Sequence, residues 1–217
     1  MRSTRLRPTA LLLVTAVTVC AADPCASFRD ARGRSAIDYA PLEGFVDVCS
    51  RGFQLCVALT QGYPPSVKTI GYFVPADEWQ RYQKGDKSGF SRYLIAQRAT
   101  TMSDSEFAGF KQYIHAQQGN IADHTNAPAT LELQERMPLG IVDEAADSIS
   151  FGAVMRFMPT GSGPLAPFWL GSVNIVLQLK GETLCLYAFD TLKAPTDTEN
   201  VKTLAKRWLS CIRARNP

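Results

Sequence analysis

Alternating apolar and polar positions are clearest near the C-terminal end of the chain. Val173, Ile175 and Leu177 fall on one face of a run over 172–180, and a second run over 183–189 is rich in residues that suit a half-buried pleated surface. A period of two residues is typical of strands with one face toward a core. Gly181 and Glu182 separate the two runs. The pattern therefore predicts a β-hairpin.

Two amphipathic helices are predicted from the residues at which they begin and from their apolar stripes. Thr196 and Glu199 spell a capping box, which predicts a helix that ends at Arg213. Ser103 and Glu106 spell another, which predicts a helix that ends near 119–120. The apolar stripe of the last helix consists of Val201, Leu204, Ala205, Trp208, Cys211 and Ile212. Such a stripe must pack against a sheet.

The middle of the chain is rich in strands that follow one another directly. The pattern predicts a hairpin over 45–59, a short helix over 77–84 capped by Asp77, and a long loop over 159–167. Further strands are expected at 67–74, 90–97, 131–135, 139–142 and 148–157. This order predicts an α+β fold: an antiparallel sheet with helices on both faces, which is a three-layer α/β/α sandwich.

The first 22 residues have the build of a secretory signal peptide. Arg2, Arg5 and Arg7 precede an apolar run over 11–19, and small residues lead to a cleavage site after Ala22. An uncleaved anchor and a lipoprotein acylated at Cys20 are the alternatives, although Val19 is large for the position before an acylated cysteine. We expect an exported protein, with a loose polar lead-in over 23–40 and a single α+β domain over 41–217.

The net charge of +3 belongs to the leader. Three of the 23 basic residues lie in 1–22 together with none of the acidic ones, which leaves 20 basic against 20 acidic residues. Nucleic-acid binding needs a clustered basic surface, so we expect no nucleic-acid partner. We expect contact with a membrane only through the leader or through lipidation at Cys20. The sequence indicates no cofactor and no metal.

The five cysteines after the leader are candidates for disulfides, because an exported protein reaches an oxidising compartment in which disulfides form. Cys49 and Cys56 are predicted to pair across a turn at Gly52. Cys185 is predicted to pair with Cys211, on the expectation that the last helix covers the Cys185 face of its strand. The helix from Ser103 would then cover the opposite face, which carries Leu184 and Leu186. Cys25 would remain as a dispensable thiol or an intermolecular bridge.

Candidate chemistry is sparse. His115 and His124 are the two histidines, and their spacing does not indicate a metal site. The sequence contains no G-x-S-x-G motif, which would have indicated an acyl-transfer site. A hydrolase with a non-standard site around His115 or His124 is the alternative to a non-enzymatic protein. Aromatic and proline residues are the better binding candidates, because interfaces favour rigid aromatic anchors. The predicted binding residues are Tyr63, Pro167, Phe168 and Trp169.

The order of elements resembles a known fold family. The strands over 139–142, 149–157, 173–179 and 184–189, followed by a helix with Trp208, are similar to the Mog1/PsbP-like α/β/α sandwich and to small exported bacterial proteins built that way. That fold hosts photosystem accessory subunits, a Ran-binding protein and chaperone-like domains. The resemblance therefore implies a binding, chaperone-like or assembly-accessory role for an unknown protein or small-molecule partner.

Overall fold

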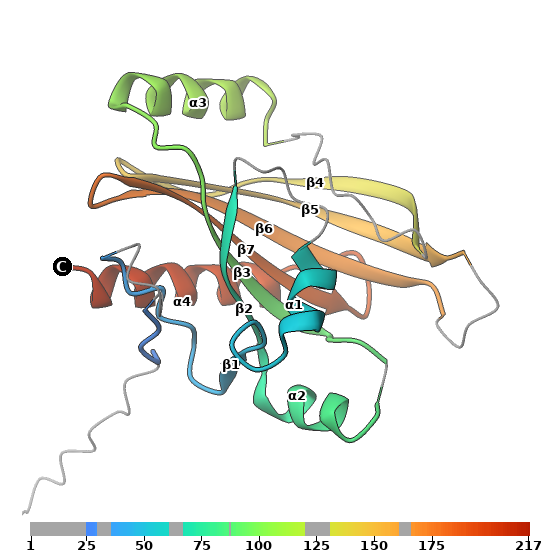
Figure 1. Cartoon of the computed structure of the whole chain (residues 1–217). Helices are drawn as coiled ribbons and strands as arrows, with labels where there is room; N and C mark the ends of the chain where they lie inside the picture. The colour runs from blue at the N-terminus through green and yellow to red at the C-terminus, as the bar shows by residue number, and fades with distance from the viewer. Residues whose placement is uncertain (1–24, 30–35, 61–66, 87, 120–130, 161–165) are drawn as a thin grey trace, which may run out of the picture.

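One antiparallel sheet of seven strands forms the centre of the molecule (Figure 1). The computed structural model describes residues 25–29, 36–60, 67–86, 88–119, 131–160 and 166–217. The strand order is β1-β2-β3-β7-β6-β5-β4. The strands are β1 Phe45–Asp47, β2 Lys68–Pro75, β3 Arg92–Arg98, β4 Leu131–Ala145, β5 Ser148–Pro159, β6 Phe168–Leu179 and β7 Glu182–Leu192.

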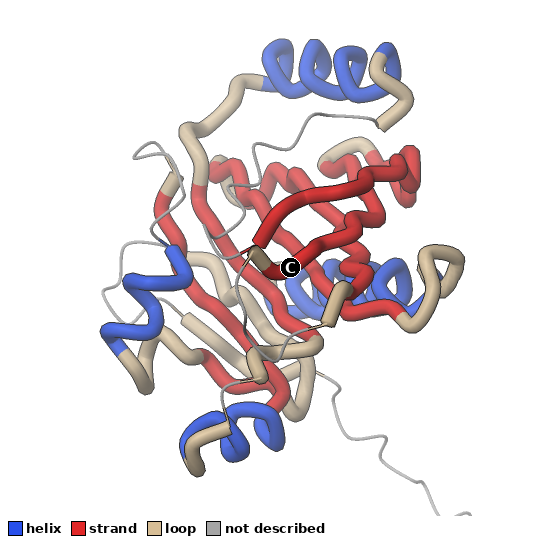
Figure 2. Tube along the Cα trace, turned by 90° about the vertical axis from the view of Figure 1, so that its right-hand side faces the viewer, coloured by secondary structure: helices blue, strands red, loops and turns tan. Residues whose placement is uncertain are grey.

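The described helices lie around this sheet (Figures 1 and 2). They are α1 Phe53–Thr60, α2 Ala76–Gln83, α3 Asp104–Ala116 and α4 Glu199–Arg215. α4 packs against one face of β6 and β7 through Val201, Trp208 and their apolar neighbours. The buried residues of α3, Phe107 and Ile114, pack with strand residues of a separate apolar cluster. The α+β class with an antiparallel sheet agrees with the prediction.

Side chains on the face of the sheet that α4 covers are buried more completely than those on the opposite face. Val173, Leu177, Leu184, Leu186 and Ala188 are all 0% exposed. Cys185 and Tyr187 alternate with them on the other face and are only half-buried. The predicted assignment of faces is therefore wrong: Leu184 and Leu186 face α4, and Cys185 packs in the cluster that contains the apolar side of α3. The uninterrupted apolar face suits the wide stripe of α4 better than a face that carries a thiol and a phenol.

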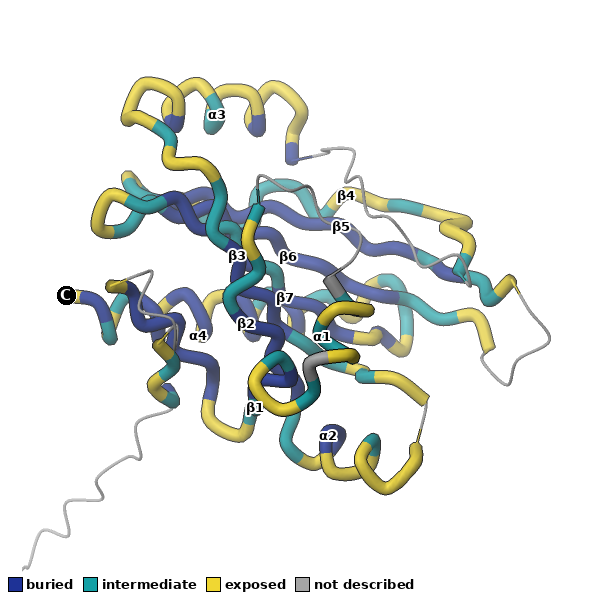
Figure 3. The backbone as a smooth tube through the Cα atoms, viewed as in Figure 1, coloured by how far each residue is buried: buried dark blue, intermediate teal, exposed yellow. Residues whose placement is uncertain are grey.

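α3 begins at the predicted capping box. The Ser103 hydroxyl accepts a hydrogen bond from the Glu106 N–H, and the Glu106 carboxylate accepts one from the Ser103 N–H at 2.7 Å. At the other end the backbone of Gly119 lies so close to β4 that a Cβ there would be 2.6 Å from the carbonyl carbon of Gly140. Both glycines have positive φ angles, which a side chain would strain. Most of the remaining surface of α3 is exposed (Figure 3).

The other predicted helix caps are wrong. α4 begins at Glu199 with Thr198 at the N-cap and no side-chain cap, so Thr196 does not close a capping box. α2 begins after Pro75 rather than at Asp77, and it also lacks a side-chain cap. Pro75 at the N-cap of α2 has no side-chain oxygen that could accept a hydrogen bond, and Thr198 at the N-cap of α4 has helical backbone angles rather than the extended ones typical of a cap. A capping motif in the sequence therefore predicted the start of α3 but not the starts of α2 and α4.

Several strands also differ from the predicted ones. β4 is continuous over fifteen residues, where two short strands were expected, because irregularities in its pairing with β5 accommodate Pro138. The hairpin expected over 45–59 is a strand followed by the helix α1. The carboxylate of Asp47 accepts hydrogen bonds from the backbone of Cys49, Ser50 and Tyr72, and this turn ends β1. The predicted bridge between Cys49 and Cys56 is nevertheless present, because it spans that turn and the start of α1.

The described part of 23–40 is packed rather than loose. Ile37 and Tyr39 are 0% exposed and belong to the same apolar cluster as Trp208. The Asn216 side-chain oxygen accepts a hydrogen bond from the Asp38 N–H at 2.9 Å. The Asn216 amide nitrogen donates a hydrogen bond to the Asp38 carbonyl at 2.8 Å. The indole N–H of Trp208 donates to the carbonyl of Tyr39. The two ends of the described chain are thus held together.

A disulfide adds a covalent link to this contact. Cys25 bonds to Cys211, with their Cα atoms 5.4 Å apart, and Cys185 is a free thiol. The predicted pairing of Cys185 with Cys211 is therefore wrong, and Cys25 is neither a leftover thiol nor part of an intermolecular bridge. The physical reason is the reversed assignment of faces: Cys211 belongs to the cluster on the α4 side of the sheet, whereas Cys185 packs on the other side.

Candidate functional site

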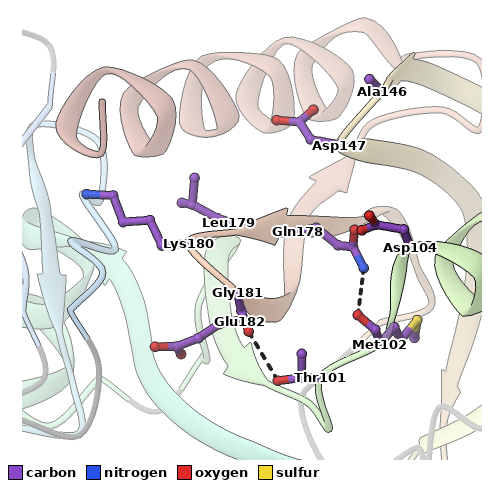
Figure 4. Close-up of a pocket in the computed structure, with 10 residues that line it drawn as sticks. All are labelled: Thr101, Met102, Asp104, Ala146, Asp147, Gln178, Leu179, Lys180, Gly181 and Glu182. Atoms are coloured by element: carbon purple, nitrogen blue, oxygen red, sulfur yellow. Dashed lines mark hydrogen bonds between the residues drawn. The ribbon is translucent and has the colours of Figure 1, made fainter.

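A hollow of about 410 Å³ lies where three turns meet at one end of the sheet (Figure 4). The segment between β3 and α3, the β4–β5 turn and the β6–β7 turn all contribute to it. Its lining residues are Thr101, Met102, Asp104, Ala146, Asp147, Gln178, Leu179, Lys180, Gly181 and Glu182. Its volume is in the range of small-molecule sites, but its lining is more polar than is usual for them.

Hydrogen bonds hold the walls of the hollow together. The Gln178 amide donates to the Met102 carbonyl at 2.9 Å, and the Thr101 hydroxyl donates to the Gly181 carbonyl at 3.4 Å (Figure 4). The Met102 N–H donates to the hydroxyl of Thr183. These bonds fix the segment before α3 against the end of the hairpin. They also occupy polar groups that a ligand would otherwise use.

The charges around the hollow are largely balanced. Asp147 pairs with Arg213 at 2.5 Å, and Glu182 pairs with Arg98 at 3.6 Å. Asp104 lies in the first turn of α3, where a negative charge is favourable. The lining contains no histidine, serine or cysteine. The hollow therefore offers hydrogen-bonding and charged groups rather than a Ser-His or Cys-His pair.

The predicted binding residues lie at the other end of β6. Trp169 and Gln178 are nine positions apart on this strand, which corresponds to roughly 30 Å. Phe168 and Trp169 belong to the strand rather than to the preceding loop, so their side chains point to opposite faces of the sheet. Pro167 is exposed. Tyr63 lies outside the described residues.

The two aromatic residues have different surroundings. Phe168 is half-buried, and its ring centroid is 5.7 Å from that of Phe157 in the cluster that also contains Trp79. Trp169 is half-buried on the α4 side of the sheet, and the guanidinium of Arg156 lies 5.6 Å from its ring centroid. Arg156 in turn pairs with Glu135 at 2.9 Å. Phe168 is therefore part of the core, and Trp169 is the better candidate for an anchor.

Trp169 belongs to a small surface patch that runs across three strands. Arg156 pairs in register with both Trp169 and Glu135, and Met137 follows Glu135 on the same side of β4. Met137 is 37% exposed, which makes it one of the few exposed large apolar residues in the described part of the chain. We call Trp169, Arg156, Glu135, Met137 and the adjacent Pro167 the Trp169 patch.

His115 is the one histidine within the described residues. His124 lies outside the part of the chain that the structure describes. The His115 side chain is 53% exposed, and its Nε2 is 2.8 Å from the carboxylate of Glu144. Lys111 also pairs with Glu144, at 3.1 Å, and its ammonium is the main cause of the lowered pKa of Glu144. His115 thus belongs to a polar cluster that links α3 to β4, and it is not among the residues that line the hollow.

Cys185 has the surroundings of an unreactive thiol. Burial raises its pKa, and a hydrogen bond with Tyr187 only partly opposes this effect. A thiol with a raised pKa has little of the thiolate form that attacks disulfides or metals. Among the described residues, no group of three or more His, Cys, Asp or Glu side chains is arranged to hold a metal ion.

Within the described ranges, no helix is both long and apolar enough to cross a membrane.

The sequence indicated Trp169 and Pro167 but not the other members of the patch. Arg156, Glu135 and Met137 join it only through the register of β4, β5 and β6, and a period-two pattern does not specify register between strands. The hollow was missed for a similar reason. Its lining comes from three separate turns, and no short motif links them.

Comparison with solved structures finds chains that are similar to this one at low sequence identity. The chain is similar to the Saccharomyces cerevisiae Ran-binding protein Mog1p, with 11% identity and a TM-score of 0.44 over 88% of this chain and 93% of that chain. A point variant of Mog1 gives 12% identity and a TM-score of 0.43 over 88% and 94%. The likeness concerns a Mog1/PsbP-like fold. No protein-family model matches the chain, and no curated protein matches it either.

Proposed function

We propose that this chain is an exported, non-enzymatic binding protein that assists or assembles with a partner protein through the Trp169 patch. Trp169 carries the proposal, because it is a large aromatic ring that stays half-exposed on a rigid strand. Arg156 lies against the ring and limits its motion. Tryptophan, arginine and methionine are enriched in the centres of protein interfaces.

Export is supported by the leader-like first 22 residues and by the two disulfides. Stable disulfides are typical of oxidising compartments and rare in the cytosol. The chain would reach such a compartment through the leader, with cleavage after Ala22. We also propose that the architecture is a three-layer α/β/α sandwich, in which α4 forms one outer layer and α3 the other. The separate apolar clusters on α4 and α3 support this description.

The patch can be tested by recovering the protein from its native compartment after cross-linking. We expect Trp169→Ala to reduce the amount of co-purifying partner about tenfold or more, because aromatic anchors at interface centres typically contribute at least 1–2 kcal/mol. Arg156→Ala should act in the same direction, because it removes the group that holds the ring. Quantitative mass spectrometry of the recovered complexes gives the measurement.

Tyr113→Ala is the matched control. Tyr113 is an aromatic residue that is 50% exposed on α3, away from the patch. It should leave recovery of the partner unchanged. Thermal unfolding of each variant separates loss of binding from loss of the fold. Equal recovery with Trp169→Ala and Tyr113→Ala would contradict the proposal, and so would a Trp169→Ala protein whose partner is lost only because it is unfolded.

A further inference from the structure

The two disulfides differ in how far solvent can reach them. Cys25 is 7% and Cys211 is 2% exposed, whereas Cys49 and Cys56 are both half-buried. They also differ in what they close: the first links residues 186 apart and the second links residues 7 apart. Thiol–disulfide exchange requires a thiolate to reach a sulfur atom, so access decides which bridge reacts first. The bridge between Cys49 and Cys56 is the accessible one.

This accessible bridge holds α1, a short helix whose intrinsic stability is low. α1 is eight residues long, and isolated helices of this length are not stable in water. It has no acidic residue in its first turn and no basic residue in its last turn to interact favourably with the helix dipole. Leu55 and Leu59 of α1 pack against an apolar cluster and are only partly buried. Val57, on its outer side, is 40% exposed.

The bridge fastens the first turn of α1 to the turn at the end of β1. Asp47 fixes that turn by accepting the backbone N–H groups of Cys49 and Ser50, at 3.2 and 2.8 Å. Cys56 lies in the first turn of α1, and its N–H donates to the Gly52 carbonyl. The covalent link thus adds to this hydrogen bonding and to the packing of Leu55 and Leu59 in holding α1 in place.

α1 covers part of an aromatic cluster that includes Val48, Tyr72 and Trp79. Trp79 is 5% exposed, and a Cβ on Gly52 would be 3.4 Å from its ring. The indole N–H of Trp79 is buried and has no hydrogen-bond partner among the described residues. An unpaired buried donor costs free energy, and access of water would remove that cost.

We propose that the bridge between Cys49 and Cys56 is a redox-sensitive clamp that sets whether α1 covers the Trp79 cluster. A thiolate of a dithiol reductant attacks the sulfur of one cysteine, forms a mixed disulfide with it and releases the other cysteine as a thiolate. The second thiol of the reductant then attacks the reductant's sulfur in the mixed disulfide and releases the first cysteine. Two electrons and two protons end on Cys49 and Cys56 as thiols, and the reductant leaves as its own disulfide. The bridge between Cys25 and Cys211 stays closed and keeps the rest of the fold intact.

The first test follows reduction of the folded, oxidised protein by dithiothreitol. Samples are alkylated at intervals and digested, and each cysteine is quantified by mass spectrometry. We expect the Cys49–Cys56 bridge to open at least about tenfold faster than the buried Cys25–Cys211 bridge, because access governs the rate. Equal rates for the two bridges would overturn the proposal.

The second test uses hydrogen–deuterium exchange of the variant with both Cys49→Ser and Cys56→Ser. Amides of α1 should exchange faster than in the unaltered protein, while those of α2 and α4 keep their protection. Cys185→Ser, which removes the thiol that forms no bridge, is the matched control and should leave α1 protected. Unchanged protection of α1 in the double variant, or loss of protection in α4 as well, would each overturn a local clamp.

Discussion

Neighbouring residues in this chain have opposite roles where a strand alternates between faces. Phe168 packs against Phe157 in the core, and Trp169 lies on the other face beneath the Arg156 guanidinium. The sequence indicated both as anchors because they were expected in a loop. Their position in β6 separates them, because successive side chains of a strand point to opposite sides. Only one of the two can therefore serve a partner on a given face.

Asp38 is the residue through which pH acts on the contact between the chain ends. Burial by itself would raise its pKa, but hydrogen bonds from the Ser27 hydroxyl and from the N–H groups of Phe28 and Ala40 outweigh this effect, with help from Arg29. The pKa of Asp38 is therefore lower in the folded than in the unfolded chain. The ionised carboxylate stabilises the folded state above the unfolded-state pKa, and that stability is lost as the pH falls through the folded-state value.

We expect Asp38→Asn to lower the free energy of unfolding at pH 7 by about 1–3 kcal/mol, since it weakens hydrogen bonds to a buried charged group. The difference from the unaltered protein should shrink as the pH falls through the acid range, because protonation removes the same charge. Urea unfolding at a series of pH values measures this. A difference that stays constant down to acid pH would show that the charge of Asp38 is not responsible.

At the scale of elements, sequence reasoning succeeded where one element carries its own signal. The capping box at Ser103 and Glu106 is local, and α3 begins there. The central strands were also found, because alternation needs no partner to be visible. The start of α1 was missed because apolar residues over 53–59 suit a strand as well as a helix. The Cys25–Cys211 pairing was missed because it depends on which face of the sheet α4 covers.

The capping box makes a prediction for α3 alone. Ser103→Ala removes the hydroxyl that accepts the Glu106 N–H, which should lower the stability of α3 by about 1 kcal/mol. Faster hydrogen exchange confined to the first turns of α3 would be the sign of this loss. Gln112→Ala, an exposed change within the same helix, is the matched control and should leave exchange unaffected. If both variants exchange alike, the capping box does not stabilise α3.

At the scale of the whole molecule, the two ends of the described chain close on each other. Cys25 forms a disulfide with Cys211. The backbone of Asp38 forms hydrogen bonds with the Asn216 side chain, and the Arg215 guanidinium donates a hydrogen bond to the Cys25 carbonyl. A bridge over so long a loop restricts the unfolded chain strongly, which in the chain-entropy model contributes about 4–5 kcal/mol. The final helix must therefore be synthesised before the N-terminal segment can take its place.

The most direct test of the account is non-reducing peptide mapping of the protein recovered from its native compartment, together with its intact mass. We predict an N-terminus at Asp23, one peptide pair joined through Cys25 and Cys211, another joined through Cys49 and Cys56, and a free thiol at Cys185. Retention of residues 1–22, or a disulfide that involves Cys185, would contradict the account.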